Sequence, residues 1–438
     1  MQGIKIYPNT KIYIPAPLGM RSGGPTLLYQ LASAIIKNST GGGGAEPQIL
    51  HYDLGWKNSP DDAYSEYHIK IAQDLQDTPE NIMIIPEAST EFLYLCKNVQ
   101  KIIWWMSVDN YAKSLALAYL QTYTNQLFVS KPIIKKFNFT DNEEISHLVQ
   151  SRYALDFLRL NNVPEERIQY LSDYLEPVFL QKAKNTDIAK KEPIVAYNPK
   201  KGLEFTQKIM AFAPNIKFIP IENMTAAEVE ELLSRAMVYI DFGEHPGKDR
   251  IPREAAISGA AVITGKRGSA ANDEDVPISA EFKFNDDEAE IPNIVKKIEE
   301  IFEDFSTYHA KFEKYREIIL NEPEKFNNDV INVFNLKPNN EIKTVAFLQS
   351  GERGKVLKQV TEREQYLKAI FRLGEEGDED LEDIEKISFD DALFLYSNGR
   401  IEKFVAFVLN DDEKEIIIGK LTDFGVSAND IIFAEVKR

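Results

Sequence analysis

The residues with the most evident chemistry lie between Asp241 and Thr264. An apolar run ends at Asp241, and a polar loop with carboxylates, a histidine and basic side chains follows it. Glu254 then opens a helical pattern, and Gly259 precedes a buried strand. This order of strand, loop, helix and strand places the loop at the carboxyl edge of a parallel sheet, where open α/β folds bind ligands. The stretch therefore predicts a ligand site.

Two series of short β-rich runs alternate with helical patterns, as is typical of parallel sheets covered on both faces. The first series has expected strands at 11–15, 48–54, 82–85, 101–106, 126–130 and 147–150. The second follows the polar segment 181–192, with strands at 193–197, 217–220, 238–242 and 261–264. In this second series, Thr225 and Glu228 have the spacing of a capping box at a helix start. We expect two Rossmann-like domains, residues 1–185 and 186–330, that face a cleft.

The last hundred residues follow a different pattern. A strand at 344–348, a helix at 355–371 and an acidic loop are followed by a hairpin at 393–407, whose Asn398–Gly399 pair suits a type I′ turn. A helix at 412–424 and a strand at 430–435 end the series. The order β-α-β-β-α-β predicts a small α+β module of ferredoxin-like topology over residues 340–438. We expect this module to serve association or regulation, including oligomer formation.

The composition excludes several kinds of partner. The 438 residues carry a formal charge of −18, so the surface repels nucleic acid and anionic lipid. Cys96 is the single cysteine, and the five histidines lack metal-ligand spacing. No run of apolar residues reaches the roughly twenty that a membrane-spanning helix needs. We expect a cytoplasmic protein without a transmembrane segment and without nucleic acid as a partner.

Several segments resemble the GT-B glycosyltransferases, over roughly residues 10–325. The turn with Gly23 and Gly24 is similar to that superfamily's Gly-rich turn after the first strand, where phosphate or acceptor approaches helix amides. The other similar segments are 105–111, 147–154, 170–177, 197–202, 252–255 and 265–270. The resemblance implies two Rossmann-like domains and the transfer of a sugar from a nucleoside diphosphate sugar.

The resemblance also implies that the second domain binds the donor. Glu254 matches the carboxylate that bonds ribose hydroxyls, although it can instead simply complement a helix dipole. Lys200 and Lys201 match the cations that neutralise the departing diphosphate, or they form a solvated turn. The remaining expected donor contacts are Arg250, Gly268 and Ser269. Lys248 and Arg253 lie in the same loop as Arg250, and these three cations either close on the diphosphate or, for at least one of them, face water.

The catalytic residues are less completely matched. Retaining relatives have a second glutamate eight residues before the position of Glu254, where this chain has Pro246. That role near the sugar then falls to Glu244, to His245 or to no residue. Asp109, just beyond a strand end, is a candidate to bind or deprotonate the acceptor hydroxyl, with the N-cap of a helix as the alternative.

We therefore expect a glycosyltransferase of polysaccharide biosynthesis that acts on a glycan or a lipid-linked glycan, with peripheral membrane contact in the second case. Gly23, Gly24 and Asp109 would face the acceptor, although the glycine pair alone also fits an ordinary turn. The resemblance implies no metal and no resident cofactor. Two alternatives remain: a catalytically silent GT-B protein that binds a glycan, nucleotide or partner enzyme, and a nucleotide-sugar epimerase.

Overall fold

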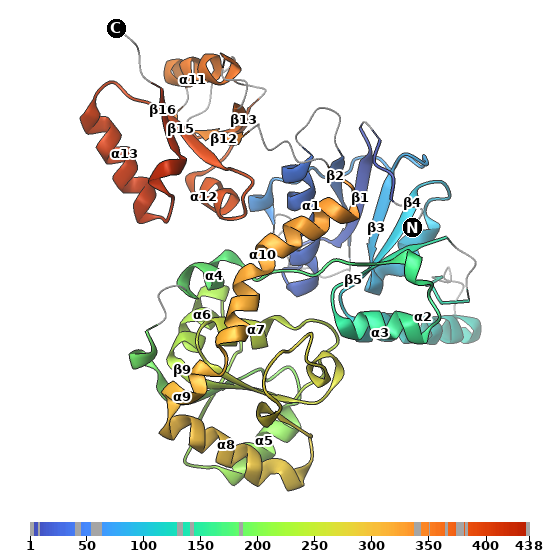
Figure 1. The fold of residues 1–438 in the computed structure, drawn as a ribbon. Coiled ribbons are helices and arrows are strands. Elements are labelled where there is room, and N and C mark those ends of the chain that lie inside the picture. Colours follow the sequence, from blue (N-terminus) through green and yellow to red (C-terminus); the bar gives the residue numbers. More distant parts are fainter. Residues whose placement is uncertain are drawn as a thin grey trace. The chain divides into compact units, whose positions relative to one another are not determined.

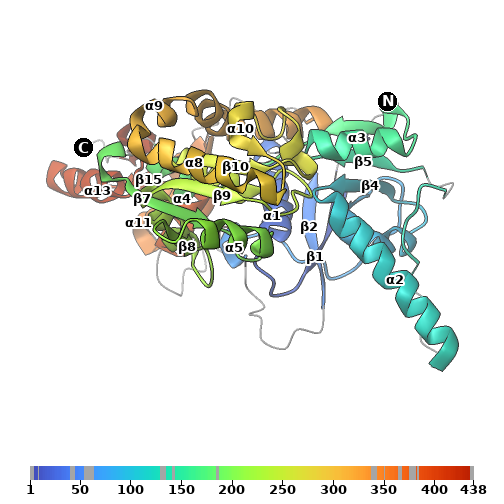
Figure 2. The same cartoon turned by 90° about the horizontal axis from the view of Figure 1, so that it is seen from below.

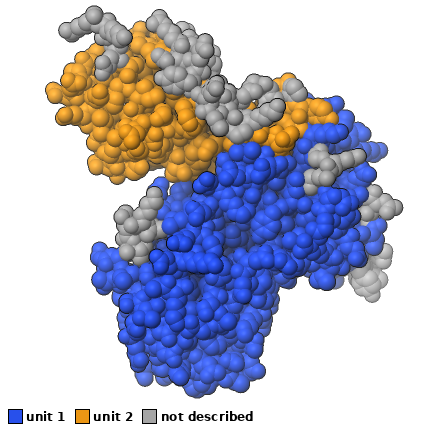
Figure 3. Space-filling view, viewed as in Figure 1, with its two compact units in different colours: residues 1–5, 76–333 blue, residues 6–75, 334–438 orange. Residues whose placement is uncertain are grey.

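The structure is a computed structural model, and its chain forms two compact units (Figure 3). Unit 1 comprises residues 1–5 and 76–333, and unit 2 comprises residues 6–75 and 334–438. The structure describes residues 4–7, 9–39, 45–53, 64–128, 135–140, 144–183, 187–336, 343–349, 351–363, 367–373, 381 and 384–434. Within these residues, no helix is both long and apolar enough to cross a membrane.

The first part of unit 1 is a parallel sheet with the order β3-β4-β5-β6. Its strands are β3 (Ile82–Pro86), β4 (Gln100–Trp105), β5 (Ser146–Val149) and β6 (Ile168–Tyr170), and its helices are α2 (Val108–Phe128) and α3 (Arg152–Leu160). Apolar side chains fill β3 and β4 and are buried, as a sheet covered on both faces requires.

The prediction of a strand at 126–130 is wrong for residues 126–128, which belong to α2. Residues 129 and 130 lie outside the described residues. No glycine or proline interrupts the helical pattern between Val108 and Lys131. The helix therefore has no stop signal before Pro132.

The second part of unit 1 is a parallel sheet with the order β11-β10-β9-β7-β8. Its strands are β7 (Glu192–Tyr197), β8 (Lys217–Pro220), β9 (Ala236–Asp241), β10 (Ala261–Gly265) and β11 (Lys283–Phe284). Its helices are α4 (Pro177–Ala183), α5 (Leu203–Phe212), α6 (Ala226–Arg235), α7 (Arg250–Ile257), α8 (Ile291–Glu303), α9 (Phe305–Ala310) and α10 (Glu313–Val333).

Helices cover both faces of this second sheet (Figures 1 and 2). Helix α5 packs against α8, whereas α6 packs against α7. The capping box expected at Thr225 and Glu228 is confirmed, because each side chain bonds the other residue's backbone amide. Short 3-10 turns join the elements at 87–94, 165–167, 188–190, 268–271, 280–282 and 288–290.

Unit 2 contains the first two strands of the chain and all of the C-terminal module. Strands β1 (Lys11–Pro17) and β2 (Glu46–Tyr52) pair in parallel, with helix α1 (Gly23–Asn38) between them in sequence and a short turn, η1 (Ser65–Tyr67), after them. The module's strands are β12 (Lys343–Phe347), β13 (Leu367–Arg372), β14 (Glu385–Lys386), β15 (Lys403–Phe407) and β16 (Ile431–Ala434). Its helices are α11 (Gly351–Arg363), α12 (Phe389–Ser397) and α13 (Asp411–Asp423), with a 3-10 turn at 428–430.

The ferredoxin-like topology expected for this module is wrong. All pairs in the order β14-β13-β12-β15-β16 are parallel, so the module is a doubly wound α/β sheet. The expected helix at 355–371 ends at Arg363, and β13 occupies its second part.

The expected hairpin at 393–407 is also wrong, because Asn398 and Gly399 end helix α12 instead. Gly399 has a φ of +69°. Its amide donates to the Tyr396 carbonyl at 2.9 Å, and the Arg400 amide donates to the Leu395 carbonyl at 2.8 Å. These two bonds form a Schellman motif, which needs a left-handed residue just as a type I′ turn does.

Candidate active site

Two loops of unit 1 meet where the strand order reverses. Strands β7 and β9 are neighbours although β8 lies between them in sequence, so the loops after β7 and β9 lie side by side at the carboxyl edge, where open α/β sheets bind ligands. A Cβ atom on Gly202, whose φ is +58°, would lie 2.5 Å from the Phe242 carbonyl oxygen. A Cβ atom on Gly243 would lie 2.3 Å from the Lys201 Cβ atom. Both positions therefore need glycine for the loops to touch.

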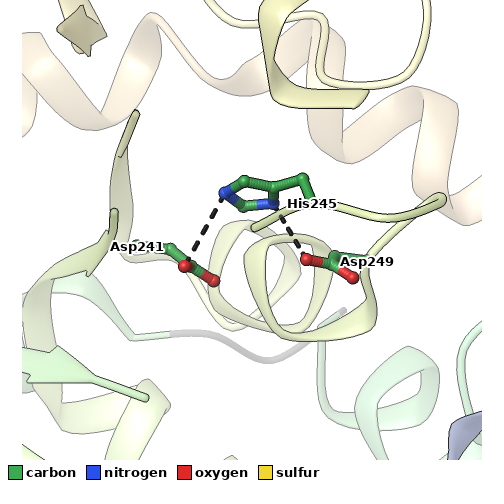
Figure 4. Close-up of side chains that lie close together, drawn as sticks. All are labelled: Asp241, His245 and Asp249. Atoms are coloured by element: carbon green, nitrogen blue, oxygen red, sulfur yellow. Dashed lines mark ion pairs between the residues drawn. The ribbon is translucent and has the colours of Figure 1, made fainter. Parts of the chain in front are cut away.

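A buried group of charged side chains lies beneath these loops. The His245 ring lies between Asp241 and Asp249, with Nε2 3.6 Å from Asp241 Oδ1 and Nδ1 2.9 Å from Asp249 Oδ2 (Figure 4). Lys201 Nζ approaches the same Asp249 oxygen to 2.7 Å. The Asp241 carboxylate also accepts bonds from the Gly243 amide and from the hydroxyl of Tyr239. His245 is fully buried, so it acts on any ligand through Asp249 and Lys201.

The charges of this group stabilise one another. Burial favours a neutral His245, but Asp249 and Asp241 outweigh it and raise the pKa of the imidazole. Burial likewise favours a protonated Asp249, but His245 and Lys201 outweigh it and lower the pKa of that carboxyl. Ligand atoms of Asp241, His245 and Asp249 lie within 4.8 Å of one another, as a metal site requires. Together with Lys201, the group contains two carboxylates and two cations, whose charges cancel without a metal ion. That the site works without a metal stays a prediction.

Arg250 has the surroundings of an anion-binding side chain. As the first residue of α7, it lies between two carboxylates, with Nη1 3.7 Å from Glu176 and Nε 3.9 Å from Glu254. Its Nε and Nη2 atoms are buried and lack a hydrogen-bond partner among the described residues. Buried N–H groups without partners are costly, and an incoming anion would satisfy them.

Glu254 is buried four residues after Arg250 on α7, so it does not open the helix as expected and lies beyond its first turn. Burial raises the pKa of Glu254 to about 7, Arg250 opposes that shift, and the negative charge of Glu176 adds to it. A carboxyl with this pKa changes protonation near neutral pH when its surroundings change. The structure thus brings together Glu254 and Arg250, as the sequence predicted, and adds Glu176.

The expectation that Arg253 is available to a diphosphate is wrong. Arg253 is fully buried and bonds Asp173 at 2.6 Å and Glu322 at 2.7 Å. Lys248 joins the same network, with Nζ 2.7 Å from Glu322 and 3.0 Å from the hydroxyl of Ser172. These two cations hold the loop before α7 to the segment after β6 and to α10.

The loop before α7 also contacts the first sheet of unit 1. The Val108 amide donates to the Pro246 carbonyl at 2.9 Å. A Cβ atom on Gly247 would lie 1.9 Å from the Met106 carbonyl oxygen. The carboxyl ends of β4 and β9 therefore approach each other at residues 246–247, within one compact unit.

Asp109 and Glu244 lie on the two sides of this junction, near Tyr153. The Tyr153 hydroxyl donates to Asp109 at 3.4 Å. Burial raises the pKa of Tyr153, and the negative charges of Asp109 and Glu244 add to that rise. Asp109 is not the N-cap of α2, because the hydroxyl of Ser107 accepts the bond from the Asn110 amide. Asp109 lies instead in the first turn of that helix.

The other predicted residues have different surroundings. Glu244 is exposed and pairs with Arg267 at 2.7 Å, and Lys200 is exposed without a side-chain partner in the described part of the chain. The Ser269 hydroxyl donates to the Gly247 carbonyl at 2.5 Å. Gly268, with a φ of +53°, lies against the His245 carbonyl oxygen. Gly268 and Ser269 therefore support the loop before α7, and a direct donor contact from them stays a prediction.

Gly23 and Gly24 begin α1 in unit 2, and a Cβ atom on Gly24 would have open space around it. Sequence analysis did not identify Glu176, Asp173 and Glu322 as members of this site. Asp173 and Glu322 lie 80 and 69 residues from Arg253, so no local spacing could have indicated them. Asp249 was detectable, since it follows His245 at the same spacing of four as His245 follows Asp241.

The fold is similar to solved glycosyltransferase structures. A sucrose-phosphate synthase from Thermosynechococcus elongatus matches with a TM-score of 0.53 and 13% identity, over 74% of this chain and 98% of that chain. Anabaena HepE in complex with UDP-glucose matches with a TM-score of 0.49 and 11% identity, over 74% and 99%. WaaG, a glycosyltransferase involved in lipopolysaccharide biosynthesis, matches with a TM-score of 0.44 and 12% identity, over 73% and 99%.

No protein-family model matches the chain, and no curated protein matches it by sequence. At such low identities a structural likeness establishes the fold alone, and the match with the highest of these TM-scores carries that conclusion. The parallel α/β sheets of unit 1 and this likeness show that the chain has the GT-B fold.

Proposed function

We propose that this protein is a glycosyltransferase that moves a sugar from a nucleoside diphosphate sugar to a hydroxyl group of a glycan or related acceptor. The observation that carries the proposal is Arg250, whose buried Nε and Nη2 atoms lack hydrogen-bond partners among the described residues, beside Glu254 at the carboxyl edge of the second sheet. An anionic ligand that also offers hydroxyl groups satisfies both side chains. A nucleoside diphosphate has both features.

In this proposal, cations at the carboxyl edge of the second sheet stabilise the negative charge that develops on the diphosphate during transfer. When the glycosidic bond breaks, the diphosphate gains negative charge, and a fixed cation then stabilises the transition state more than the ground state. Arg250 lies between two carboxylates at 3.7 and 3.9 Å, beyond hydrogen-bond distance, so its N–H groups are available to the diphosphate. Lys200 is exposed and adds a mobile charge, whereas Lys201 is engaged with Asp249.

Glu254 has the hydrogen-bonding role toward the ribose. A carboxylate offers two oxygens to two adjacent hydroxyl groups, and its pKa near 7 allows it to be charged when bound. Asp109 and Glu244 are the candidates for the acceptor side, because both lie near Tyr153. Deprotonation of the acceptor hydroxyl by a carboxylate would supply the nucleophile.

A second candidate function is a catalytically silent protein that binds a nucleotide or glycan. The observation in its favour is Pro246, which stands where retaining relatives have a glutamate, while the nearby Glu244 is paired with Arg267. The two functions share the donor site and differ only in turnover.

The test measures nucleotide affinity and then turnover. We expect one of UDP, GDP, ADP or CMP to raise the melting temperature, because a ligand that binds only the folded state stabilises it. Arg250→Gln and Glu254→Gln should each weaken that nucleotide about tenfold, since each removes a charge-assisted hydrogen bond. Arg235→Gln, a change in an exposed ion pair on α6, is the matched control and should bind as the wild type.

Binding that is unchanged in both site variants would contradict the proposed donor site. Binding without sugar transfer or donor hydrolysis, across a panel of glycan acceptors, would select the silent protein instead.

A further inference from the structure

Unit 2 contains a cavity of about 440 Å³ that is separate from the site in unit 1. One wall comes from the end of α1, the start of β2 and the residues after η1, and the other comes from β12, β13, β14 and Arg400. The two walls are far apart in sequence but belong to one compact unit. Volumes of this size are typical of pockets for small organic ligands.

The cavity is lined by an excess of basic side chains, although the chain as a whole carries a charge of −18. Lys37, Lys70, Lys368 and Arg400 line it, together with His68. The lining has two carboxylates, and both are already engaged: Glu46 bonds Lys70 at 2.6 Å, and Glu385 bonds His68 at 2.6 Å. The lining thus has more cations than carboxylates, with Glu402 near Lys37 and Glu385 near Arg400 as further counter-charges.

Arg400 is the central feature of this cavity. It is only 5% exposed, and its Nη1 atom donates to the carbonyl oxygens of Tyr67 and His68. Its Nε atom is buried and has no hydrogen-bond partner among the described residues. The guanidinium carbon lies 5.4 Å from the centre of the Phe371 ring, which fixes its plane.

An anion is the ligand that this arrangement lacks. A buried guanidinium with an unpartnered N–H is costly, and burial lowers the pKa of Arg400 to about 10, which still leaves the group charged at neutral pH. Burial also lowers the pKa of Lys37. Both shifts show that positive charge is held here against a desolvation cost, which a bound anion would relieve.

We propose that this cavity binds a small phosphomonoester, with Arg400 and Lys368 contacting the phosphate. A phosphate oxygen accepts from Arg400 Nε, and the exposed Lys368 on β13 adds a second cation. The apolar lining of Ile36, Ile370 and Phe371 contacts the organic part. The inference does not depend on the function proposed for unit 1.

The experiment measures binding of phosphomonoesters to the full chain by calorimetry. Glucose 6-phosphate and adenosine monophosphate are compared with glucose, adenosine and inorganic phosphate. We expect one of the two phosphomonoesters to bind, and the tighter of them identifies the organic group. Glucose and adenosine should not bind, and inorganic phosphate should bind more weakly than the ester.

Lys368→Gln should weaken the phosphomonoester about tenfold, because it removes one charge-assisted contact. Lys386→Gln, on the neighbouring strand β14 and outside the lining, is the matched control and should bind as the wild type. Arg400→Lys keeps the positive charge but loses the planar set of N–H donors of the guanidinium, and should weaken binding as strongly as Lys368→Gln.

Three results would overturn the proposal. The first is wild-type affinity in both Lys368→Gln and Arg400→Lys. The second is affinity for inorganic phosphate equal to that for the ester, since the apolar wall would then contribute nothing. The third is an ester whose binding is lost in Arg250→Gln and kept in Lys368→Gln, because it would then occupy the site in unit 1.

Discussion

Arg250 and Arg253 lie three positions apart on α7, and their surroundings are opposite. Arg253 is satisfied by carboxylates at 2.6 and 2.7 Å, whereas the carboxylates nearest to Arg250 are 3.7 and 3.9 Å away. Breaking one of the close pairs is costly, because it leaves a buried charge without its partner. The long pairs hold Arg250 in position but leave its N–H groups available. Arg253 thus stabilises the loop through its ion pairs, whereas Arg250 has N–H groups that can bind a ligand.

The protonation of Glu254 should affect stability near neutral pH. Its carboxyl has a pKa of about 7 in the folded chain and an ordinary value of 4.5 when unfolded. The folded state then binds the proton more tightly, so this group's contribution to stability falls as pH rises from 4.5 to 7, by about 3 kcal/mol at most. Glu254→Gln should remove that fall, and urea unfolding at pH 5 and pH 8 measures it.

The matched control is Glu317→Gln, a change at an exposed position on α10, which should keep the wild-type pH dependence. If Glu254→Gln keeps it too, the carboxyl does not titrate in this range. The difference between variants is the quantity to compare, because other groups also titrate there.

Residue types at the site could be predicted from the sequence, but their partners could not. Glu254, Arg250 and Lys201 were identified through the resemblance to the GT-B donor site, and the order of elements placed their loops at the carboxyl edge of a parallel sheet. The different surroundings of Arg250 and Arg253 depend on Asp173 and Glu322, which contact α7 only after the chain has folded.

At the scale of elements, local signals succeeded where a single structure satisfies them. The capping box at Thr225 and Glu228 has one geometry, and the structure has it. The Asn398–Gly399 pair is compatible with at least two geometries, since both a hairpin turn and a helix end accept a left-handed glycine. Tertiary packing decides between them: Leu395 and Phe404, on either side of the pair, are both buried in the core of a parallel module.

Gly268→Ala should destabilise the protein, because the loop before α7 needs close approach at this position. The φ of +53° is unfavourable for alanine, and the added Cβ atom would lie 2.0 Å from the His245 carbonyl oxygen. We expect a loss of about 1–3 kcal/mol in the free energy of unfolding, measured by urea denaturation. Gly419→Ala is the control, since that helical glycine has open space and should be neutral or stabilised. Equal stability of the two variants would show that the loop after β10 moves freely.

At the scale of the whole chain, unit 1 is stabilised by buried ion pairs between segments that are distant in sequence. Arg253 joins α7, the segment after β6 and α10 through Asp173 and Glu322. The sequence predicted the α/β fold and both series of strands in it apart from the strand expected at 126–130, because periodicity and turn signals are local. It did not predict this network or the grouping of residues 6–75 with residues 334–438, because both depend on contacts between distant segments.

Arg253→Ala should lower the free energy of unfolding by about 3–5 kcal/mol, because it leaves two buried carboxylates without their cation. Urea denaturation followed by tryptophan fluorescence measures the loss. Arg235→Ala removes an exposed pair and should leave stability unchanged within error. A loss in Arg253→Ala no larger than that of the control would mean that Lys248 alone neutralises the network.

The split of unit 2 across the chain has a consequence for synthesis. Residues 6–75 leave the ribosome early, yet the rest of their unit starts only at residue 334. At about 5–20 residues per second, roughly 260 further residues take tens of seconds to translate. During that interval the ring of Tyr67 contacts Tyr29 and Tyr64 at most, because Phe394, which it meets in the finished unit, has not yet been translated. The nascent chain therefore carries an unfinished apolar surface while residues 76–333 are translated.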